Sequence, residues 1–160
     1  MDINSFRNPL VVTFHSKCIM AIDFGEKFMG ISLYRVGVDP YPLAHGRIAN
    51  TSEEFVSLEL SKIISDELVD IIVIGVPYFL DGKASKMTQK ILEFCQHINQ
   101  KFSLPVYRQD ETLSSYSAKD RMENSPQYNF KVDLKQIDAV AATIILEDFL
   151  QNTNPQQEIK

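Results

Sequence analysis

Cysteine is scarce in this chain, and no C-x-x-C pair occurs. The 160 residues contain only Cys18 and Cys95, and each lies within an apolar run. This pattern favours two buried thiols in a reducing compartment over a disulfide framework or a paired redox motif. The chain also has no apolar run near the roughly 18 residues of a membrane span. Residues 1–17 lack the basic head and long apolar stretch of a signal peptide, so we expect a cytoplasmic protein.

Positive charge is in short supply as well. The net charge is −5 and the isoelectric point is about 5.2, whereas a general nucleic-acid binder is usually basic. An acidic chain can still act on nucleic acid if a bound metal ion and a few clustered lysines supply positive charge locally, as in a metal-dependent nuclease. The three histidines (His15, His45 and His97) stand in no recognisable nucleophile motif, which argues against a serine or cysteine hydrolase.

Hydrophobic patterning predicts one α/β domain over residues 18–150, with a loosely attached extension at 1–17 and a polar tail at 151–160. Strands are expected at 18–23, 30–36, 43–48, 70–76 and 105–109, and helices from the capping box to about 67 and at 83–102, 114–123 and 137–150, with a loop at 124–135. That capping box pairs Thr51 with Glu54. The short links between the first three strands predict an antiparallel meander in a mixed sheet covered by helices.

Three acidic residues stand where a hydrophobic core does not favour them. Asp23 ends an apolar strand, Glu111 follows the last predicted strand, and Asp138 lies in the first turn of the apolar final helix. Each has a simpler explanation: a turn aspartate, a solvated strand end, and an acid at a helix N-terminus. Neighbouring strand residues point to opposite faces, so only one of Asp110 and Glu111 can share a face with Asp23. Two alanines one turn after Asp138 would let that helix approach the sheet closely.

Taken together, the three acids suit a divalent metal. Carboxylate oxygens are the hard ligands that Mg²⁺ or Mn²⁺ prefers. Two carboxylates about 5 Å apart repel by roughly 3 kcal/mol at an effective dielectric of about 20, and a cation between them removes this conflict. Such a site could activate water against a phosphodiester. Spacing along the chain does not itself bring the three acids together.

Four short motifs, in order along the chain, resemble those of the YqgF/RuvX family. Residues 19–31 resemble its D-x-G-T-K-x-x-G opening, 74–82 its G-[LV]-P…D-G segment, 110–115 its D-E-R-L-[ST]-[ST] segment, and 137–147 its final D-x-x-A-A…I-L helix. That family is described as RNase H-like nucleases that mature the small-subunit ribosomal RNA precursor or resolve Holliday junctions. The resemblance implies an RNase H-like fold whose five-stranded mixed sheet places the first and fourth strands side by side. It also implies Asp23, Glu111 and Asp138 as catalytic residues that bind Mg²⁺ or Mn²⁺.

The chain departs from the family pattern at three positions. Glu26 replaces the usual Thr, Phe79 a common Asn, and Thr112 the usual Arg after the acidic pair. Loss of that arginine removes a bidentate contact to phosphate. The residues expected to contact nucleic acid instead are Lys27, Lys83, Lys86, Arg108, Ser114 and Lys135.

Three functions stay open at the level of sequence. The leading hypothesis is metal-dependent cleavage of structured nucleic acid by a monomer or homodimer, at the 5′ end of pre-16S rRNA in ribosome biogenesis or in branched DNA. A non-catalytic RNA-binding ribosome-assembly factor is the second, favoured by the acidic isoelectric point and the lost arginine. The third is an ATP-binding enzyme of the actin, Hsp70 and sugar-kinase kind, which shares the D-x-G turn. Such enzymes need two of these domains, and the chain is long enough for one. No membrane partner is expected.

Overall fold

The computed structural model describes residues 14–77, 85–110, 114–151 and 158–159, and its centre is a six-stranded sheet in the order β3-β2-β1-β4-β5-β6. The strands are β1 Cys18–Asp23, β2 Phe28–Arg35, β3 Leu43–Ala49, β4 Ile71–Val76, β5 Val106–Asp110 and β6 Glu158–Ile159. The first three pair antiparallel, whereas β4 runs parallel to β1 and β5 runs parallel to β4. The expected five-stranded mixed sheet is confirmed, with the first and fourth strands adjacent, and β6 adds two residues at its edge.

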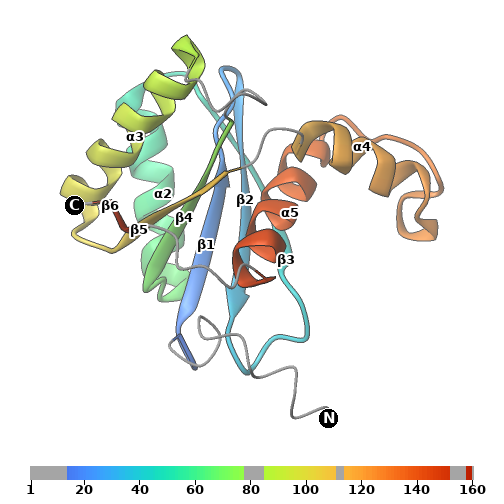
Figure 1. The fold of residues 1–160 in the computed structure, drawn as a ribbon, viewed down its shortest axis with the longest axis horizontal. Coiled ribbons are helices and arrows are strands. Elements are labelled where there is room, and N and C mark those ends of the chain that lie inside the picture. Colours follow the sequence, from blue (N-terminus) through green and yellow to red (C-terminus); the bar gives the residue numbers. More distant parts are fainter. Residues whose placement is uncertain (1–13, 78–84, 111–113, 152–157, 160) are drawn as a thin grey trace.

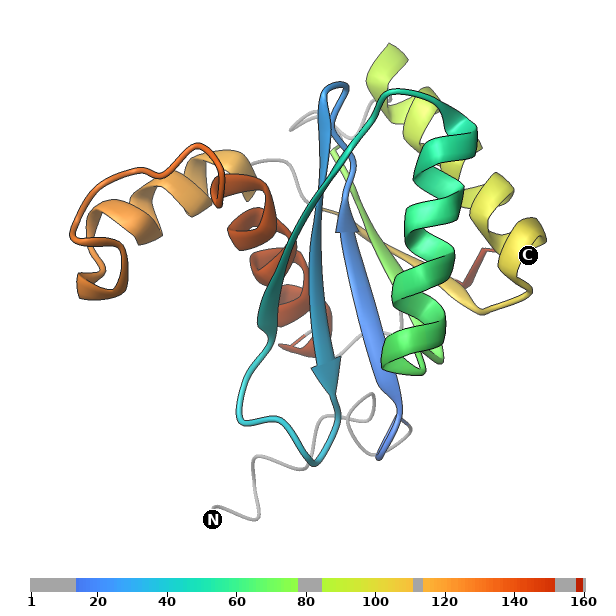
Figure 2. The same cartoon turned by 180° about the vertical axis from the view of Figure 1, so that it is seen from behind.

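Helices cover both faces of the sheet (Figures 1 and 2). On one face lie α2 Glu53–Glu67 and α3 Lys86–Phe102, and on the other α5 Ile137–Gln151. Next to α5 lies α4 Ser114–Glu123, followed by the short 3₁₀ helix η2 Pro126–Tyr128 within the expected loop. Within the described ranges, no helix combines the length and apolarity needed to cross a bilayer.

The core follows from the apolar runs of the sequence. Nearly every residue of β1 and β4 is buried, because helices pack against both faces of these central strands. In α3, Ile91, Cys95 and Ile98 form the buried stripe that its helical spacing predicts. The final helix α5 is buried over most of its length, as its uniformly apolar sequence predicts.

Both flanking segments contact the domain. β6, inside the segment expected to be a polar tail, pairs antiparallel with β5. Phe14, inside the expected N-terminal extension, is buried with its ring centroid 5.7 Å from that of Tyr107 and 6.2 Å from that of Phe149. Phe14 thus packs on the α5 face of the sheet, whereas β6 extends the sheet at its β5 edge, near α3.

The start of α2 differs from the predicted capping box. The N-cap is Ser52, whose hydroxyl oxygen accepts a hydrogen bond of 3.1 Å from the Phe55 amide. The pairing of Thr51 with Glu54 is therefore wrong by one residue. Adjacent Thr and Ser can both cap a helix, so the local sequence does not decide between them.

Candidate functional site

Asp23 ends β1 with its side chain directed to the α5 side of the sheet. Ile19 and Ala21, four and two residues earlier, pack in the hydrophobic cluster that α5 contributes to. Met20 and Ile22 alternate with them and pack in the cluster on the other face. Because side chains alternate along a strand, Asp23 falls on the α5 face, at the point where the apolar packing of β1 ends.

Gly30 allows the start of α5 to approach this strand end. It pairs with Asp23 across the antiparallel β1–β2 ladder. A Cβ atom on Gly30 would overlap the carbonyl oxygen of Asp138 and would lie 2.9 Å from the amide nitrogen of Ala139. The first turn of α5 therefore rests on bare backbone, which confirms the close helix–sheet approach expected from the sequence. Asp138 in that turn is placed beside Asp23.

One turn later, a buried hydrogen bond fixes α5 to β2. The hydroxyl of Ser32 donates to the carbonyl oxygen of Ala142 at 2.9 Å, and both residues are fully buried. A buried hydroxyl needs such a partner, and only a small residue at 142 lets the helix backbone come within its reach. The two contacts, at Gly30 and at Ser32, set how α5 presents Asp138.

The pKa values of both carboxylates are raised above their ordinary values. Burial, together with the smaller effect of the negative charge on Asp138, raises the pKa of Asp23 from 3.8 to about 7. Burial also raises the pKa of Asp138, while the nearby Arg47 guanidinium lowers it. In the metal-free protein, the pair therefore carries less than two full negative charges near neutral pH.

Arg47 is a site residue that the sequence analysis missed. On β3 it pairs with Gly30, which in turn pairs with Asp23, so the three residues form one row across the sheet. Its guanidinium carbon lies 3.6 Å from the ring centroid of Phe28, and Nη1 lies 3.8 Å from Oδ2 of Asp138. Arg47 thus provides a positive charge beside the acids, although the arginine of the family pattern is replaced by Thr112.

The third predicted ligand, Glu111, lies outside the described residues, as do Phe79 and Thr112. β5 ends directly before it. Tyr107 packs on the α5 side of the sheet, so alternation places Asp110, three residues later, on the opposite side, where it is exposed. Asp110 does not share the face of Asp23.

The residues expected to contact nucleic acid are dispersed. Lys27 in the β1–β2 turn, Lys86 at the start of α3 and Lys135 before α5 are all exposed. Arg108 alternates with Tyr107 and lies on the α3 side, where its charge acts on Cys95. Lys83 and the side chain of Ser114 lie outside what the structure describes.

The carboxylates of Asp23 and Asp138 are suitable ligands for a divalent metal. The described part of the chain contains no group of three His, Cys, Asp or Glu residues close enough to hold a metal. It does bring two hard carboxylate donors together, and burial, with the charge of Asp138, makes Asp23 resist ionisation. Mg²⁺ is commonly held by one or two carboxylates plus waters and substrate phosphate oxygens, so this donor set suits it.

A family model and the relatives found among known proteins indicate the same family for this chain. A family model described as "RuvX: Holliday junction resolvase" matches residues 17–152. A protein of Maridesulfovibrio salexigens named "Putative pre-16S rRNA nuclease" is 33% identical over 135 residues, which cover 82% of this chain and 96% of that protein. A protein of Haemophilus ducreyi with the same name is 33% identical over 140 residues, covering 86% and 97%.

Solved structures agree on the fold. RuvC of Thermus thermophilus in complex with a Holliday junction substrate superposes with a TM-score of 0.55 at 10% sequence identity, covering 89% of this chain and 99% of that one. A further structure of Thermus thermophilus RuvC superposes with a TM-score of 0.56 at 11% identity. At such low identity the likeness establishes the RNase H-like fold alone.

Proposed function

The chain belongs to the RuvX family, and on that premise we propose that it is a divalent-metal-dependent nuclease that processes the 5′ end of pre-16S rRNA in the cytoplasm. The supporting observation is the approach of Asp138 to Asp23 across Gly30. Two ionised carboxylates this close together repel each other unless a proton or a cation lies between them. A turn aspartate or a helix N-terminal acid acting alone would not require this juxtaposition.

Each described residue of the site has a distinct role in this proposal. Asp23 and Asp138 hold Mg²⁺ or Mn²⁺, with Glu111 proposed from the sequence as the third carboxylate. When bound, the ion would polarise the phosphodiester and lower the pKa of the attacking water. Gly30 keeps the first turn of α5 against the sheet, so that Asp138 stays within reach of Asp23.

Arg47 supplies the phosphate contact in this proposal. Its guanidinium is held over the Phe28 ring and beside Asp138, and 28% of its side chain is exposed. Arginine N–H groups bind phosphate oxygens through paired, charge-assisted hydrogen bonds. Lys27 and Lys135, which flank the site in the chain, would add electrostatic attraction along the substrate backbone.

Cleavage assays of Asp23→Asn and Asp138→Asn test the proposal. We expect each substitution to lower Mg²⁺- or Mn²⁺-dependent cleavage of a pre-16S rRNA 5′ fragment by about 100-fold or more, equivalent to about 2.7 kcal/mol of transition-state stabilisation. Asp66→Asn, at an exposed position of α2, makes the same chemical change away from the site and should leave the rate unchanged. An undiminished rate in purified Asp23→Asn protein would exclude the proposed mechanism.

Branched DNA is a second candidate substrate, which the description of the matching family model favours. The same preparations would be assayed on a synthetic four-way DNA junction. If the protein cleaves the junction with Mg²⁺ and leaves the rRNA fragment intact, branched DNA replaces pre-16S rRNA as the proposed substrate. Binding of the rRNA fragment without cleavage of either substrate in any divalent metal would instead favour a ribosome-assembly factor.

A further inference from the structure

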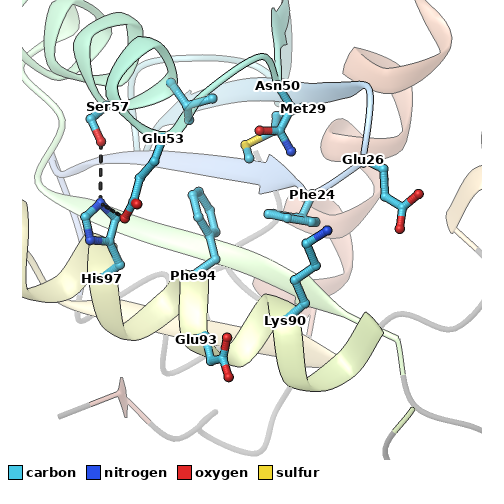
Figure 3. A pocket seen from close by; sticks show the side chains of 11 residues that line it. Phe24, Glu26, Met29, Asn50, Glu53, Ser57, Lys90, Glu93, Phe94 and His97 are labelled. Carbon is cyan, nitrogen blue, oxygen red and sulfur yellow. Dashed lines mark hydrogen bonds and ion pairs between the residues drawn. The ribbon is translucent and has the colours of Figure 1, made fainter. Parts of the chain in front are cut away.

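A cavity lies on the face of the sheet opposite Asp23, between α2, α3 and the turn that follows β1 (Figure 3). Its volume is about 400 Å³. Phe24, directly after Asp23 in the chain, lines this cavity, because consecutive side chains at the end of β1 point to opposite faces. The cavity is therefore separate from the site of Asp23 and Asp138, although both adjoin the same end of β1.

The floor of the cavity is apolar and largely aromatic. The rings of Phe24 and Phe94 are tilted by 58° with centroids 5.1 Å apart, and Figure 3 shows both side chains at the centre of the cavity. Met29 and Val56, each 2% exposed, form the base. Such a surface favours a large apolar or aromatic side chain over a polar one.

The rim of the cavity carries an excess of negative charge. Glu26, Glu53 and Glu93 line it and are all exposed, against a single ammonium group from Lys90. The three carboxylates come from three elements: the β1–β2 turn, α2 and α3. This charge disfavours a phosphate backbone and favours a cationic occupant.

The geometry of the cavity does not form a serine–histidine–acid catalytic triad. Ser57, His97 and Glu53 lie together, as Figure 3 shows. However, Ser57 Oγ and Glu53 Oε1 approach the same ring atom, His97 Nε2, at 3.5 and 3.0 Å. In a catalytic triad the acid and the nucleophile contact opposite ring nitrogens. The cavity is thus better suited to binding than to nucleophilic chemistry.

We propose that this cavity, termed here the acidic groove (Phe24, Glu26, Glu53, Glu93 and Phe94), binds a basic segment of a partner polypeptide. One large apolar side chain of the partner packs on Phe24 and Phe94. Lysine or arginine residues on either side of that anchor pair with the rim carboxylates. A central apolar anchor ringed by charge pairs is a common arrangement for recognition of short segments by proteins.

Fluorescence anisotropy with defined peptides tests this proposal. The probes are glycine-spaced, fluorescein-labelled peptides with a Lys-Trp-Lys centre, compared with Glu-Trp-Glu and Lys-Ala-Lys centres. We expect the Lys-Trp-Lys peptide to bind wild-type protein at least about tenfold more tightly than either other peptide. Replacing both Glu26→Gln and Glu53→Gln, or Phe94→Ala, should remove this preference. If circular dichroism shows that Phe94→Ala does not fold, Phe94→Leu takes its place.

Matched controls separate the acidic groove from general charge and from the nuclease proposal. The double substitution Glu67→Gln and Glu123→Gln changes net charge equally at exposed sites outside the groove and should preserve binding. Asp23→Asn should also bind the peptide as wild type does, whatever the outcome of the cleavage assays. The proposal is overturned by three results: no saturable binding up to about 1 mM, binding that survives both groove variants, or a single-stranded RNA that binds wild type but not Phe94→Ala.

Discussion

At the scale of the residue, Asp23 makes the metal-free protein sensitive to pH. Its pKa is raised from 3.8 to about 7, so the folded protein retains this proton over a range where the unfolded chain has lost it. The contribution to stability is fully present below about pH 4 and is lost as the pH rises through about 7. A shift of this size corresponds to at most about 4 kcal/mol, because each pKa unit is worth about 1.4 kcal/mol.

Asp23→Asn should therefore stabilise the metal-free protein at alkaline pH. In EDTA at pH 8 we expect urea denaturation to give the variant a free energy of unfolding higher by about 2 to 4 kcal/mol. At pH 4 the difference should be small, because wild-type Asp23 is then protonated. The same measurement on Asp66→Asn corrects for the general loss of one negative charge. A difference between Asp23→Asn and wild type that does not change with pH would contradict the account.

At the scale of the element, two glycines show how tightly α5 packs on the sheet. A methyl group on Gly30 would meet backbone atoms of Asp138 and Ala139, which cannot rotate away. A methyl group on Gly75 would meet the end of the Ile145 side chain, which can adopt another rotamer. Alanine at each of the two positions therefore compares the loss of stability when the added methyl group meets backbone with the loss when it meets a movable side chain.

Gly30→Ala should displace the start of α5, whereas Gly75→Ala should not. Urea denaturation measures the effect of each substitution on the free energy of unfolding. We expect Gly30→Ala to lower it by about 3 kcal/mol or more and Gly75→Ala by about 1 kcal/mol. Gly30→Ala should also weaken Mn²⁺ binding, because it separates Asp138 from Asp23. Equal losses of stability with unchanged Mn²⁺ binding would show that the approach of α5 to Gly30 does not create the site.

The sequence predicts elements better than it predicts their register. The uninterrupted apolar runs identified β1 and β4, and the helical spacing in α3 identified its buried stripe, because these signals are local. Arg47 was missed because its place beside Asp138 depends on the pairing of β3 with β2. That pairing shifts between Gly30 and Ser32, and a shift of this kind has no signature in the alternation of β3 itself.

The convergence of the acids could be predicted only through the family resemblance. Asp23 and Asp138 are 115 residues apart in the chain, and nothing between them indicates that Gly30 receives the start of α5. The pairing of the last residues with β5 escaped prediction because β6 is two residues long. Elements this short carry too few side chains to show a period.

At the scale of the whole molecule, the end of β1 separates two surfaces of different chemistry. Asp23 faces α5 and the proposed metal site, and Phe24 faces α2, α3 and the acidic groove. Because the net charge of the chain is −5, the proposed binding of nucleic acid requires metal, Arg47 and lysines to offset this charge locally. The opposite surface keeps its acidic character and remains available to a basic partner.

The central claim is that Asp23 and Asp138 together hold one divalent ion. Isothermal titration of Mn²⁺ into wild-type, Asp23→Asn, Asp138→Asn and Asp66→Asn proteins tests it without requiring any substrate. We expect saturable binding that is at least about tenfold weaker in Asp23→Asn and Asp138→Asn than in wild type, and unchanged in Asp66→Asn. Binding of equal affinity in all four proteins would contradict it.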